Sequence, residues 1–193
     1  MNPYRSKRVL DLAVAATACI LFAPIAAGVA AATFLEDGGP ALFRQPRVGR
    51  NRHSFTILKF RSMRDGQITR VGHWLRRTGI DELPQFVNVW RGEMSVVGPR
   101  PLTGQDVQRL CWTTAQHDWR FAASPGITGI AQLLAGSGAR SSERLERLYL
   151  KRQSVALDLQ LIALSFAANL VGKRKVRRWI RAASLPRQTS PAL

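Results

Sequence analysis

The sequence predicts a mixed α/β fold that is mainly helical and monotopic, with an N-terminal re-entrant helix in a membrane and a small cytoplasmic domain with short strands. Three observations support this prediction. Leu12 to Leu35 contains no charged residue but has Pro24 at its middle. Basic residues lie on both sides of this apolar run. Two short strand-like segments then precede segments with helical periodicity.

Composition bounds the class of protein before any motif is considered. A chain of 193 residues, 46% of them hydrophobic, is most simply one folded domain rather than a disordered tail. The net charge of +17 attracts polyanions, which can be nucleic acids, anionic lipid headgroups or phosphorylated substrates. The two cysteines form no disulfide framework, which favours a reducing, cytoplasm-facing location, and the scattered histidines predict no zinc site.

The apolar run is long enough to enter a membrane, since a spanning helix needs about 20 apolar residues. Pro24 removes one helical hydrogen bond, so we expect a break or kink there. A helix that dips in and returns keeps both basic flanks on the cytoplasmic side, which positive residues prefer. These flanks carry Arg5, Lys7 and Arg8 before the run, and Arg44, Arg47, Arg50 and Arg52 after it.

Two other interpretations of this run stay open. A straight spanning helix would place one basic flank on the opposite side of the membrane. A signal peptide has the basic start and the small residues Ala30 to Ala32 in its favour. The run is too long for an ordinary signal peptide, however, and Asp11 interrupts its approach. The re-entrant helix is therefore the preferred interpretation.

The middle of the chain predicts two strands and two helices. After the turn at 38–40, Ala41 to Gln45 and Phe55 to Phe60 are strand-like in composition. Ile68 to Arg77 predicts a helix, because Val71, Trp74 and Leu75 follow helical spacing. Proline is tolerated in a first helical turn, so a second helix is expected from Pro84 to about Trp90.

Asp81 and Glu82 are the candidate catalytic carboxylates, and they lie at or just before the start of this second helix. Acids in that position often do no more than complement the helix dipole. The chain has no glycine-rich phosphate loop, so any phosphate binding must come from side chains. An acidic pair among cations suits Mg²⁺ with a diphosphate. The cations nearby in sequence are Lys59, Arg61, Arg76, Arg77 and Arg100.

Two turns rich in proline and glycine follow. Pro99 and Pro101 hold Arg100 on a stiff non-helical turn, which suits bidentate recognition of a phosphate but equally fits a solvated surface arginine. Pro125 to Gly129 is expected to be a tight turn that shapes a pocket wall.

Four ordered motifs together resemble the bacterial sugar transferase family, the monotopic polyprenyl-phosphate phosphoglycosyl transferases. They are Lys-Phe-Arg-Ser-Met at 59–63, Asp-Glu-Leu-Pro-Gln at 81–85, Val-Gly-Pro-Arg-Pro at 97–101 and Pro-Gly-Ile-Thr-Gly at 125–129. The segment 38–50 also looks like the family, and the resemblance runs from about Lys7 to Asp158. Three positions depart from the common pattern: Ala23 stands where many members have Ser, Ser124 where a basic residue is frequent, and Ile130 where Trp is frequent.

The resemblance implies a function. Such an enzyme transfers a sugar-1-phosphate from a UDP-sugar to undecaprenyl phosphate, giving UMP and a polyprenyl-diphosphate-sugar that initiates exopolysaccharide, capsule or glycoconjugate synthesis. It implies that Asp81 is the nucleophile of a two-step reaction through a phosphosugar-aspartate, and that Glu82 helps to hold Mg²⁺ or, alternatively, Mn²⁺. Lys59, Arg76 and Arg100 fall at basic positions that hold phosphates. A ternary-complex transfer, with Asp81 only a metal ligand, stays open.

The resemblance also implies a place in the cell, which is the cytoplasmic face of the bacterial inner membrane. The Pro24 break matches the re-entrant helix of the family. The expected partners are a UDP-sugar, polyprenyl phosphate and anionic lipids, with no nucleic acid, and an oligomer is compatible with the sequence. A membrane-anchored polyanion-binding protein is the alternative from another class, but it leaves the acidic pair and the apolar run with its central proline unexplained.

The C-terminal region predicts a helix from Leu157 to Val171 and then a basic segment. That segment reads either as an interfacial anchor for anionic lipids or as a solvated charge run. Its members are Lys173, Arg174, Lys175, Arg177, Arg178 and Arg181, with Trp179 among them. We expect a loose tail from Pro186 to Leu193. The whole chain is then one domain, with the membrane helix at 1–36, the catalytic region at 37–172 and the basic helix and tail at 173–193.

Overall fold

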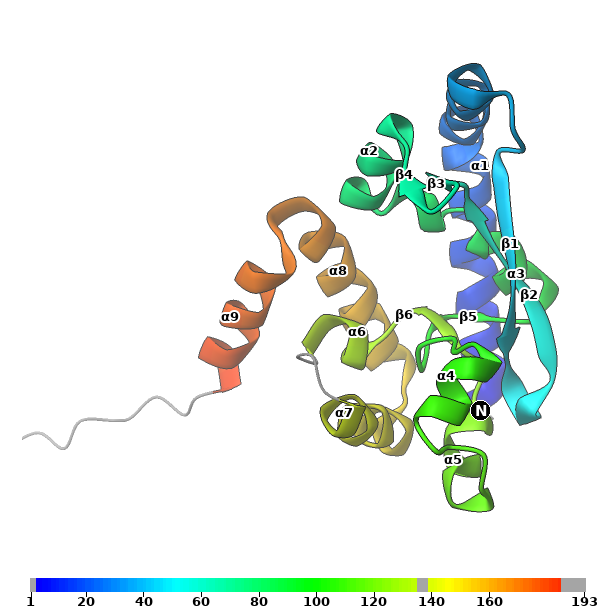
Figure 1. Ribbon diagram of the computed structural model, residues 1–193. Coiled ribbons are helices and arrows are strands. Elements are labelled where there is room, and N and C mark those ends of the chain that lie inside the picture. Colours follow the sequence, from blue (N-terminus) through cyan, green and yellow to red (C-terminus); the bar gives the residue numbers. More distant parts are fainter. Residues whose placement is uncertain (1–2, 135–138, 185–193) are drawn as a thin grey trace, which may run out of the picture.

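The computed structural model describes residues 3–134 and 139–184, and these residues are mostly helical, as predicted (Figure 1). The strands in this part of the chain form three separate two-stranded pairings rather than one sheet. One long helix, α1, runs along one side of the molecule, and the shorter elements pack beside it. The expected tail from Pro186 to Leu193 lies outside the described residues.

Helix α1 spans Pro3–Asp37 and contains Pro24 without an end to the helix at that point. Figure 1 shows the first turns of α1 from the side, one above the other, whereas its last turns overlap. The helix therefore changes direction along its length. Its part from Arg5 to Asp37 is long enough to cross a membrane, and the most apolar 18-residue window in it has a mean hydropathy of 2.2. Only 17% of its most apolar window is buried, so the described part of the chain leaves most of this apolar surface uncovered.

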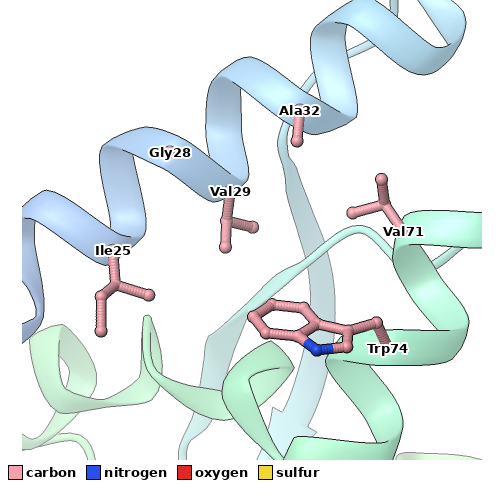
Figure 2. Close-up of a pocket in the computed structure, with 6 residues that line it drawn as sticks. All are labelled: Ile25, Gly28, Val29, Ala32, Val71 and Trp74. Atoms are coloured by element: carbon pink, nitrogen blue, oxygen red, sulfur yellow. The ribbon is translucent and has the colours of Figure 1, made fainter.

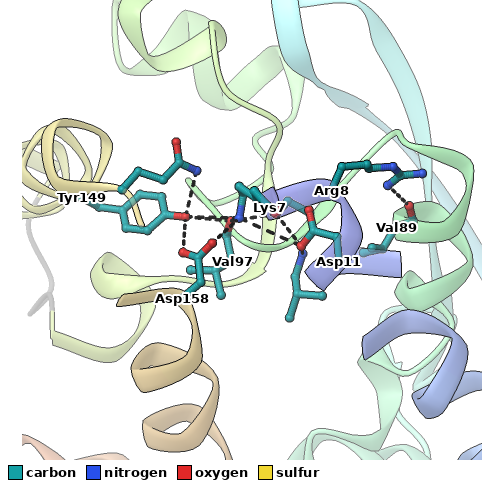
Figure 3. A network of polar contacts seen from close by, with 10 residues as sticks. Lys7, Arg8, Asp11, Val89, Val97, Tyr149 and Asp158 are labelled. Atoms are coloured by element: carbon teal, nitrogen blue, oxygen red, sulfur yellow. Dashed lines mark hydrogen bonds and ion pairs between the residues drawn. The ribbon is translucent and has the colours of Figure 1, made fainter. Parts of the chain in front are cut away.

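Both ends of α1 are tied to the same domain. At the N-terminal end, Lys7 Nζ lies 2.7 Å from the Asp158 carboxylate, and Arg8 donates to the carbonyl of Val89 at 2.7 Å (Figure 3). At the C-terminal end, Glu36 accepts hydrogen bonds from the backbone N–H of Arg70 at 2.7 Å and of the next residue at 3.2 Å. Both ends of the helix are therefore attached to the same domain.

Two antiparallel hairpins follow α1. Strands β1 (Leu42–Val48) and β2 (Ser54–Phe60) pair in register from Leu42–Phe60 to Val48–Ser54, with η1 (Arg50–Arg52) at the turn. Both strands were predicted, although β1 continues past Gln45. The second hairpin, β3 (Met63–Arg64) with β4 (Gln67–Ile68), turns on Asp65 and Gly66, which both have positive φ.

The two predicted central helices are confirmed with shifted starts. Helix α2 spans Arg70–Thr78 and is capped by the Thr69 hydroxyl, so the prediction that it begins at Ile68 was wrong because Ile68 pairs in β4. Between α2 and α3 (Gln85–Arg91) lies a 3-10 turn, η2 (Ile80–Glu82). The acidic pair is therefore on a separate short element just before α3.

The segment expected to be a tight turn at 125–129 contains a strand instead. Strand β6 (Gly126–Thr128) pairs in parallel with β5 (Ser95–Val97). The two backbones lie so close that a Cβ on Gly126 would be 2.1 Å from the Gly98 nitrogen. Glycine at both positions lets the two motifs pair directly, a distant pairing that neither short segment reveals alone.

The remaining helices surround this pair. Helix α4 (Gly104–Arg109), η3 (Ala115–His117) and α5 (Asp118–Phe121) follow β5, and α6 (Ile130–Leu134) and α7 (Ala139–Arg152) follow β6. The predicted helix near 157–171 is confirmed as α8 (Val155–Val171), capped by Ser154. The basic segment forms α9 (Lys173–Ser184).

The main core lies between the N-terminal half of α1, α3, β5, α7 and α8. Its fully buried members include Ala15, Val89, Met94, Tyr149 and Leu161. A polar network lies within it, because Tyr149 donates to the Asp158 carboxylate at 2.7 Å and Lys7 donates to the Val97 carbonyl at 2.9 Å (Figure 3). Since Val97 belongs to β5, this network joins α1 to the strand that leads into Pro99–Pro101.

Candidate active site

The acidic pair is presented by a sharp change of direction between two helices. Gly79 ends α2 in the left-handed conformation, with φ of 75°, which a residue with a Cβ adopts at a cost. The chain then forms η2, and Pro84 leads into α3. This break keeps Asp81 and Glu82 off both helices, so they do not simply cap α3.

Asp81 is partly buried next to another carboxylate. Its pKa is raised, first because burial removes solvent from the charged form and then because the Glu82 charge repels it. The charges of Lys59 and Arg76 act in the opposite direction. A carboxylate held in this way gains most from a further cation or from a bond to an electrophile.

Glu82 is held by Lys59 from strand β2. The Lys59 ammonium donates to Glu82 Oε1 at 2.7 Å, and the Glu82 side chain keeps 41% of its surface exposed. The structure thus brings together Lys59, Glu82 and Asp81, which come from two separate motifs. Lys59 contacts the acidic pair itself in this arrangement.

Arg76 connects the acidic pair to the Lys-Phe-Arg-Ser-Met motif. Its Nε donates to the Ser62 hydroxyl at 2.9 Å. Helix α2 lies directly on this motif, because a Cβ on Gly72 would be 2.0 Å from the Ser62 carbonyl oxygen. The close approach sets where Arg76 stands relative to Asp81.

Arg61 and Arg77 are placed differently from each other. The Arg61 guanidinium forms an ion pair with Asp37 and donates to the Pro40 carbonyl at 2.7 Å, so it ties the end of α1 to β2. Arg77 is exposed on α2 and has no hydrogen-bond or ion-pair partner among the residues in 3–134 and 139–184. Only Arg77 of these two has its charge available to a ligand.

Arg100 is exposed between its two prolines, and the structure adds Arg47 beside it. Burial lowers the pKa of Arg47; the Asp106 carboxylate raises it, the Arg100 charge lowers it, and the Glu82 charge raises it. Arg47 is therefore within electrostatic reach of both Arg100 and Glu82. Sequence reasoning placed Arg47 only in the basic flank of the apolar run; its signal was its position inside the family-like segment 38–50.

The carboxylate pair fits a metal shared with a substrate. The described part of the chain holds no group of three or more His, Cys, Asp or Glu side chains suited to a metal. Mg²⁺ commonly takes one or two carboxylates and completes its shell with water and substrate phosphates. Asp81 and Glu82 are a donor set of that kind.

An apolar groove of about 380 Å³ lies between the second half of α1 and helix α2 (Figure 2). In the close-up, Ile25 and Val29 point from α1 toward the Trp74 ring, and Val71 faces Ala32. Trp74 is half exposed, although it is large and apolar. Arg77 follows three residues after Trp74, on the same side of α2. Trp74, which lines the groove, is therefore followed on the same helix by the two cations Arg76 and Arg77.

Comparison with known proteins agrees with these motifs. A model of the bacterial sugar transferase family matches residues 3–172. The chain is 41% identical over 170 residues to the UDP-glucose:undecaprenyl-phosphate glucose-1-phosphate transferase of Caulobacter vibrioides, covering 81% of this chain and 62% of that protein. It is 34% identical over 188 residues to the transferase of the same name from Escherichia coli, covering 86% and 40%.

Other relatives carry different names. The chain is 35% identical over 185 residues to the UDP-N-acetylgalactosamine-undecaprenyl-phosphate N-acetylgalactosaminephosphotransferase of Aeromonas hydrophila, covering 86% of this chain and 44% of that protein. The chain thus spans less than two thirds of the length of these three relatives. In each case the matched region includes most of this chain, and therefore most of the fold described above.

Proposed function

The chain belongs to the bacterial sugar transferase family, and on that basis we propose that it transfers a sugar-1-phosphate from a UDP-sugar to undecaprenyl phosphate. The products are UMP and a polyprenyl-diphosphate-sugar, the first lipid-linked unit of an exopolysaccharide, capsule or glycoconjugate. The observation that carries the proposal is the partly buried Asp81, whose pKa is raised by burial and by Glu82 and lowered by Lys59 and Arg76. The relatives' names supply the substrate class.

We propose a two-step reaction at Asp81. In the first step a carboxylate oxygen of Asp81 attacks the sugar-bearing phosphorus, and the bond from that phosphorus to the bridging oxygen breaks, so that UMP leaves with the electron pair. In the second step a phosphate oxygen of the polyprenyl phosphate attacks the same phosphorus. The bond to Asp81 then breaks and its carboxylate is restored. No net proton is consumed in either displacement.

Charge neutralisation at this site is divided among several groups. Asp81 and Glu82 would hold Mg²⁺ or Mn²⁺, which when bound offsets repulsion between the carboxylates and the diphosphate. Arg76, Arg77 and Arg100 bind phosphate oxygens, while Lys59 orients Glu82 through their 2.7 Å contact. Arg61 would reach a phosphate only by leaving Asp37, so its role in this proposal is to anchor the end of α1.

The acceptor enters from the membrane. The groove of Figure 2 is lined by apolar atoms and lies between the membrane helix and α2, so it suits the first isoprene units of a polyprenyl chain. A tail lying along Trp74 would leave its phosphate near Arg77, one turn further along α2. This arrangement would bring the acceptor phosphate toward Asp81 from the lipid side.

We further propose that α1 is re-entrant and that the catalytic region lies on the cytoplasmic face of the inner membrane. The support is that Arg8 and Glu36, near the two ends of α1, both bond to the same domain. Between them, side chains such as Ile20 (74% exposed) and Leu21 face outward and would contact lipid. The exposed cations of α9 would lie against anionic headgroups, at about 1 kcal/mol for each charge near the surface.

The direct test is UMP release from a panel of UDP-sugars, with undecaprenyl phosphate and Mg²⁺. We expect one donor to be turned over, and Asp81→Asn and Glu82→Gln each to lose at least about 100-fold in kcat/KM. Asp65→Asn is the matched control, because Asp65 is a carboxylate in the β3–β4 turn whose side chain is 92% exposed. Full activity of Asp81→Asn would contradict the proposed role of this residue.

A further inference from the structure

The backbone of the Pro99–Arg100–Pro101 turn is bonded at every polar group that it possesses. The Pro99 carbonyl accepts from the Gly126 N–H at 2.8 Å, and the Pro101 carbonyl accepts from Arg47 at 3.1 Å. The two prolines have no N–H to donate. This leaves only the N–H and the carbonyl of Arg100 itself.

One buried ion pair binds both of these groups. The Arg100 N–H donates to Glu146 Oε1 at 3.1 Å, and the Arg100 carbonyl accepts from Arg120 Nη2 at 2.6 Å. Arg120 and Glu146 bind each other through two hydrogen bonds, at 2.6 and 3.1 Å. Each of their side chains is only 4% exposed. Arg120 comes from α5 and Glu146 from α7, so two helices meet on one residue of the turn.

The side chain of Arg100 is left out of this arrangement. It is exposed, and among residues 3–134 and 139–184 it has no hydrogen-bond or ion-pair partner. The Arg100 charge lowers the pKa of Arg47, and the Glu82 charge raises it. The turn is therefore fixed at its backbone and presents one unpaired guanidinium, which lies within electrostatic reach of Arg47.

A buried ion pair is a costly way to hold a fold together. Apolar side chains of similar volume often stabilise a protein as well or better, because the two charges lose their hydration on burial. What the apolar alternative lacks is a donor and an acceptor at fixed positions. Arg120 and Glu146 supply one of each to the same residue, as positioning of Arg100 requires.

We infer that Arg120 and Glu146 are a positioning pair, which fixes the Arg100 backbone so that its guanidinium meets the diphosphate of the nucleotide-sugar. This inference rests on the proposed function for the identity of the ligand. Neither Arg120 nor Glu146 touches the substrate. Both act through Arg100, and this indirect action distinguishes them from residues that only stabilise the fold.

The test measures the affinity for UDP and the melting temperature of four variants. Arg100→Ala and Glu146→Gln should each weaken UDP binding by about tenfold or more, whereas the double variant should bind no more weakly than Arg100→Ala alone. Glu143→Gln is the matched control and should bind UDP as the wild type does. Glu143 lies one turn earlier on α7 and pairs with the exposed Arg147 at 3.0 Å.

Two additional measurements test the inference in case Glu146→Gln does not fold. Arg120→Met combined with Glu146→Met replaces the pair by apolar side chains of similar volume; it should fold and still bind UDP about tenfold more weakly. In the wild type, the Arg100 amide should exchange its hydrogen slowly, because Glu146 accepts from it in a buried site. Rapid exchange of that amide contradicts the inference without any variant.

The outcomes separate this inference from the proposed function. UDP affinity within twofold of the wild type in a folded Glu146→Gln or double-Met variant overturns the positioning role. The same conclusion follows if Glu146→Gln weakens binding by a further tenfold when Arg100 is already Ala. A wild type that binds UDP through Arg100 but releases no UMP from any UDP-sugar would refute the proposed transfer and leave the positioning pair standing.

Discussion

The ionised Asp81 carboxylate lowers the free energy of unfolding, and the same carboxylate is the nucleophile of the proposed reaction. Burial and the Glu82 charge raise its pKa, so the folded protein binds the proton more tightly than the unfolded chain does. Between the unfolded pKa and the raised folded pKa, the free energy of unfolding therefore falls as pH rises. Above this window the ionised Asp81 destabilises the apoprotein, as is common for groups that act in a site.

This cost predicts how Asp81→Asn changes stability with pH. Without divalent cations, the variant should have the higher free energy of unfolding at neutral pH, and this difference should shrink as the pH falls toward 3.8, the ordinary value of the carboxyl. Urea unfolding in detergent at several pH values measures it. A variant that is less stable than the wild type at pH 7 would show that the Asp81 charge is compensated in the fold.

At the residue scale, sequence reasoning identified the acidic pair but not all of its surroundings. The motifs singled out Asp81, Glu82 and Lys59, and Arg76 was added as a cation nearby in sequence. The structure brings these four together. The pairing of Arg61 with Asp37 was not foreseen, because a guanidinium near a site in sequence can bond to any carboxylate that folding brings near it.

At the scale of elements, the placement of α2 depends on one glycine. A Cβ at position 72 would be 2.0 Å from the Ser62 carbonyl oxygen, which is backbone and has little room to move. Gly72→Ala must therefore shift α2, and Arg76 with it, away from Asp81. We expect a loss of about 1–3 kcal/mol in the free energy of unfolding and a fall in kcat/KM for UMP release.

The matched control for this change is Gly104→Ala. Gly104 is the first residue of α4, and a Cβ there has no atom within 4 Å. Its stability should stay within about 1 kcal/mol of the wild type, because alanine is the better helix former. If both variants are equally stable and equally active, α2 is not held in place by contact with Ser62.

The ion pair that attaches α1 to α8 leads to a second prediction at this scale. Asp158 is buried and binds Lys7 at 2.7 Å, so Asp158→Ala leaves the Lys7 ammonium with only Asp11, at 4.0 Å, as a counter-charge. Asp158→Ala should lower the free energy of unfolding by about 3–5 kcal/mol, measured by urea unfolding in detergent. Glu143→Gln, which breaks an exposed pair, should cost less than about 1 kcal/mol. A similar small cost for both would mean that the Lys7 contact does not anchor α1.

The elements that the sequence predicted are those with a strong local signal. Strand β2 has a β-branched and aromatic composition, and α8 is a long apolar segment after a serine cap. Strand β6 was missed because a three-residue strand is defined by its distant partner β5. The short helices α4 and α5 were missed because so few residues show no periodicity.

At the scale of the whole molecule, the path of α1 governs how the chain would meet the two proposed substrates. One of these is soluble in water and the other is dissolved in lipid. If both ends of α1 are on the cytoplasmic side, the domain lies at the headgroups and Asp81 can reach a UDP-sugar from the cytoplasm and a polyprenyl phosphate from the bilayer. The sequence predicted such a helix from its charges, and the bonds at Arg8 and Glu36 are the structural support.

This path predicts the labelling of cysteines on the two flanks of α1. In a Cys19→Ser, Cys111→Ser background, Arg5→Cys and Arg70→Cys both place a thiol on an exposed position. The first lies near the start of α1, and the second lies on α2 beside Glu36, near the end of α1. In intact spheroplasts, a maleimide that does not cross membranes should label neither residue, and in inverted vesicles it should label both. Labelling of one residue in spheroplasts and the other in inverted vesicles would mean that the helix spans the membrane.

The mass of the intact protein after incubation with its UDP-sugar and Mg²⁺, without an acceptor, tests whether Asp81 forms the proposed covalent intermediate. We expect an added sugar phosphate on the wild type, located on the peptide that contains Asp81, together with about one equivalent of released UMP. Undecaprenyl phosphate should remove the adduct, and Asp81→Asn should form none. Turnover with acceptor but neither adduct nor UMP in its absence would contradict the claim, and would assign Asp81 to metal binding in a ternary-complex transfer.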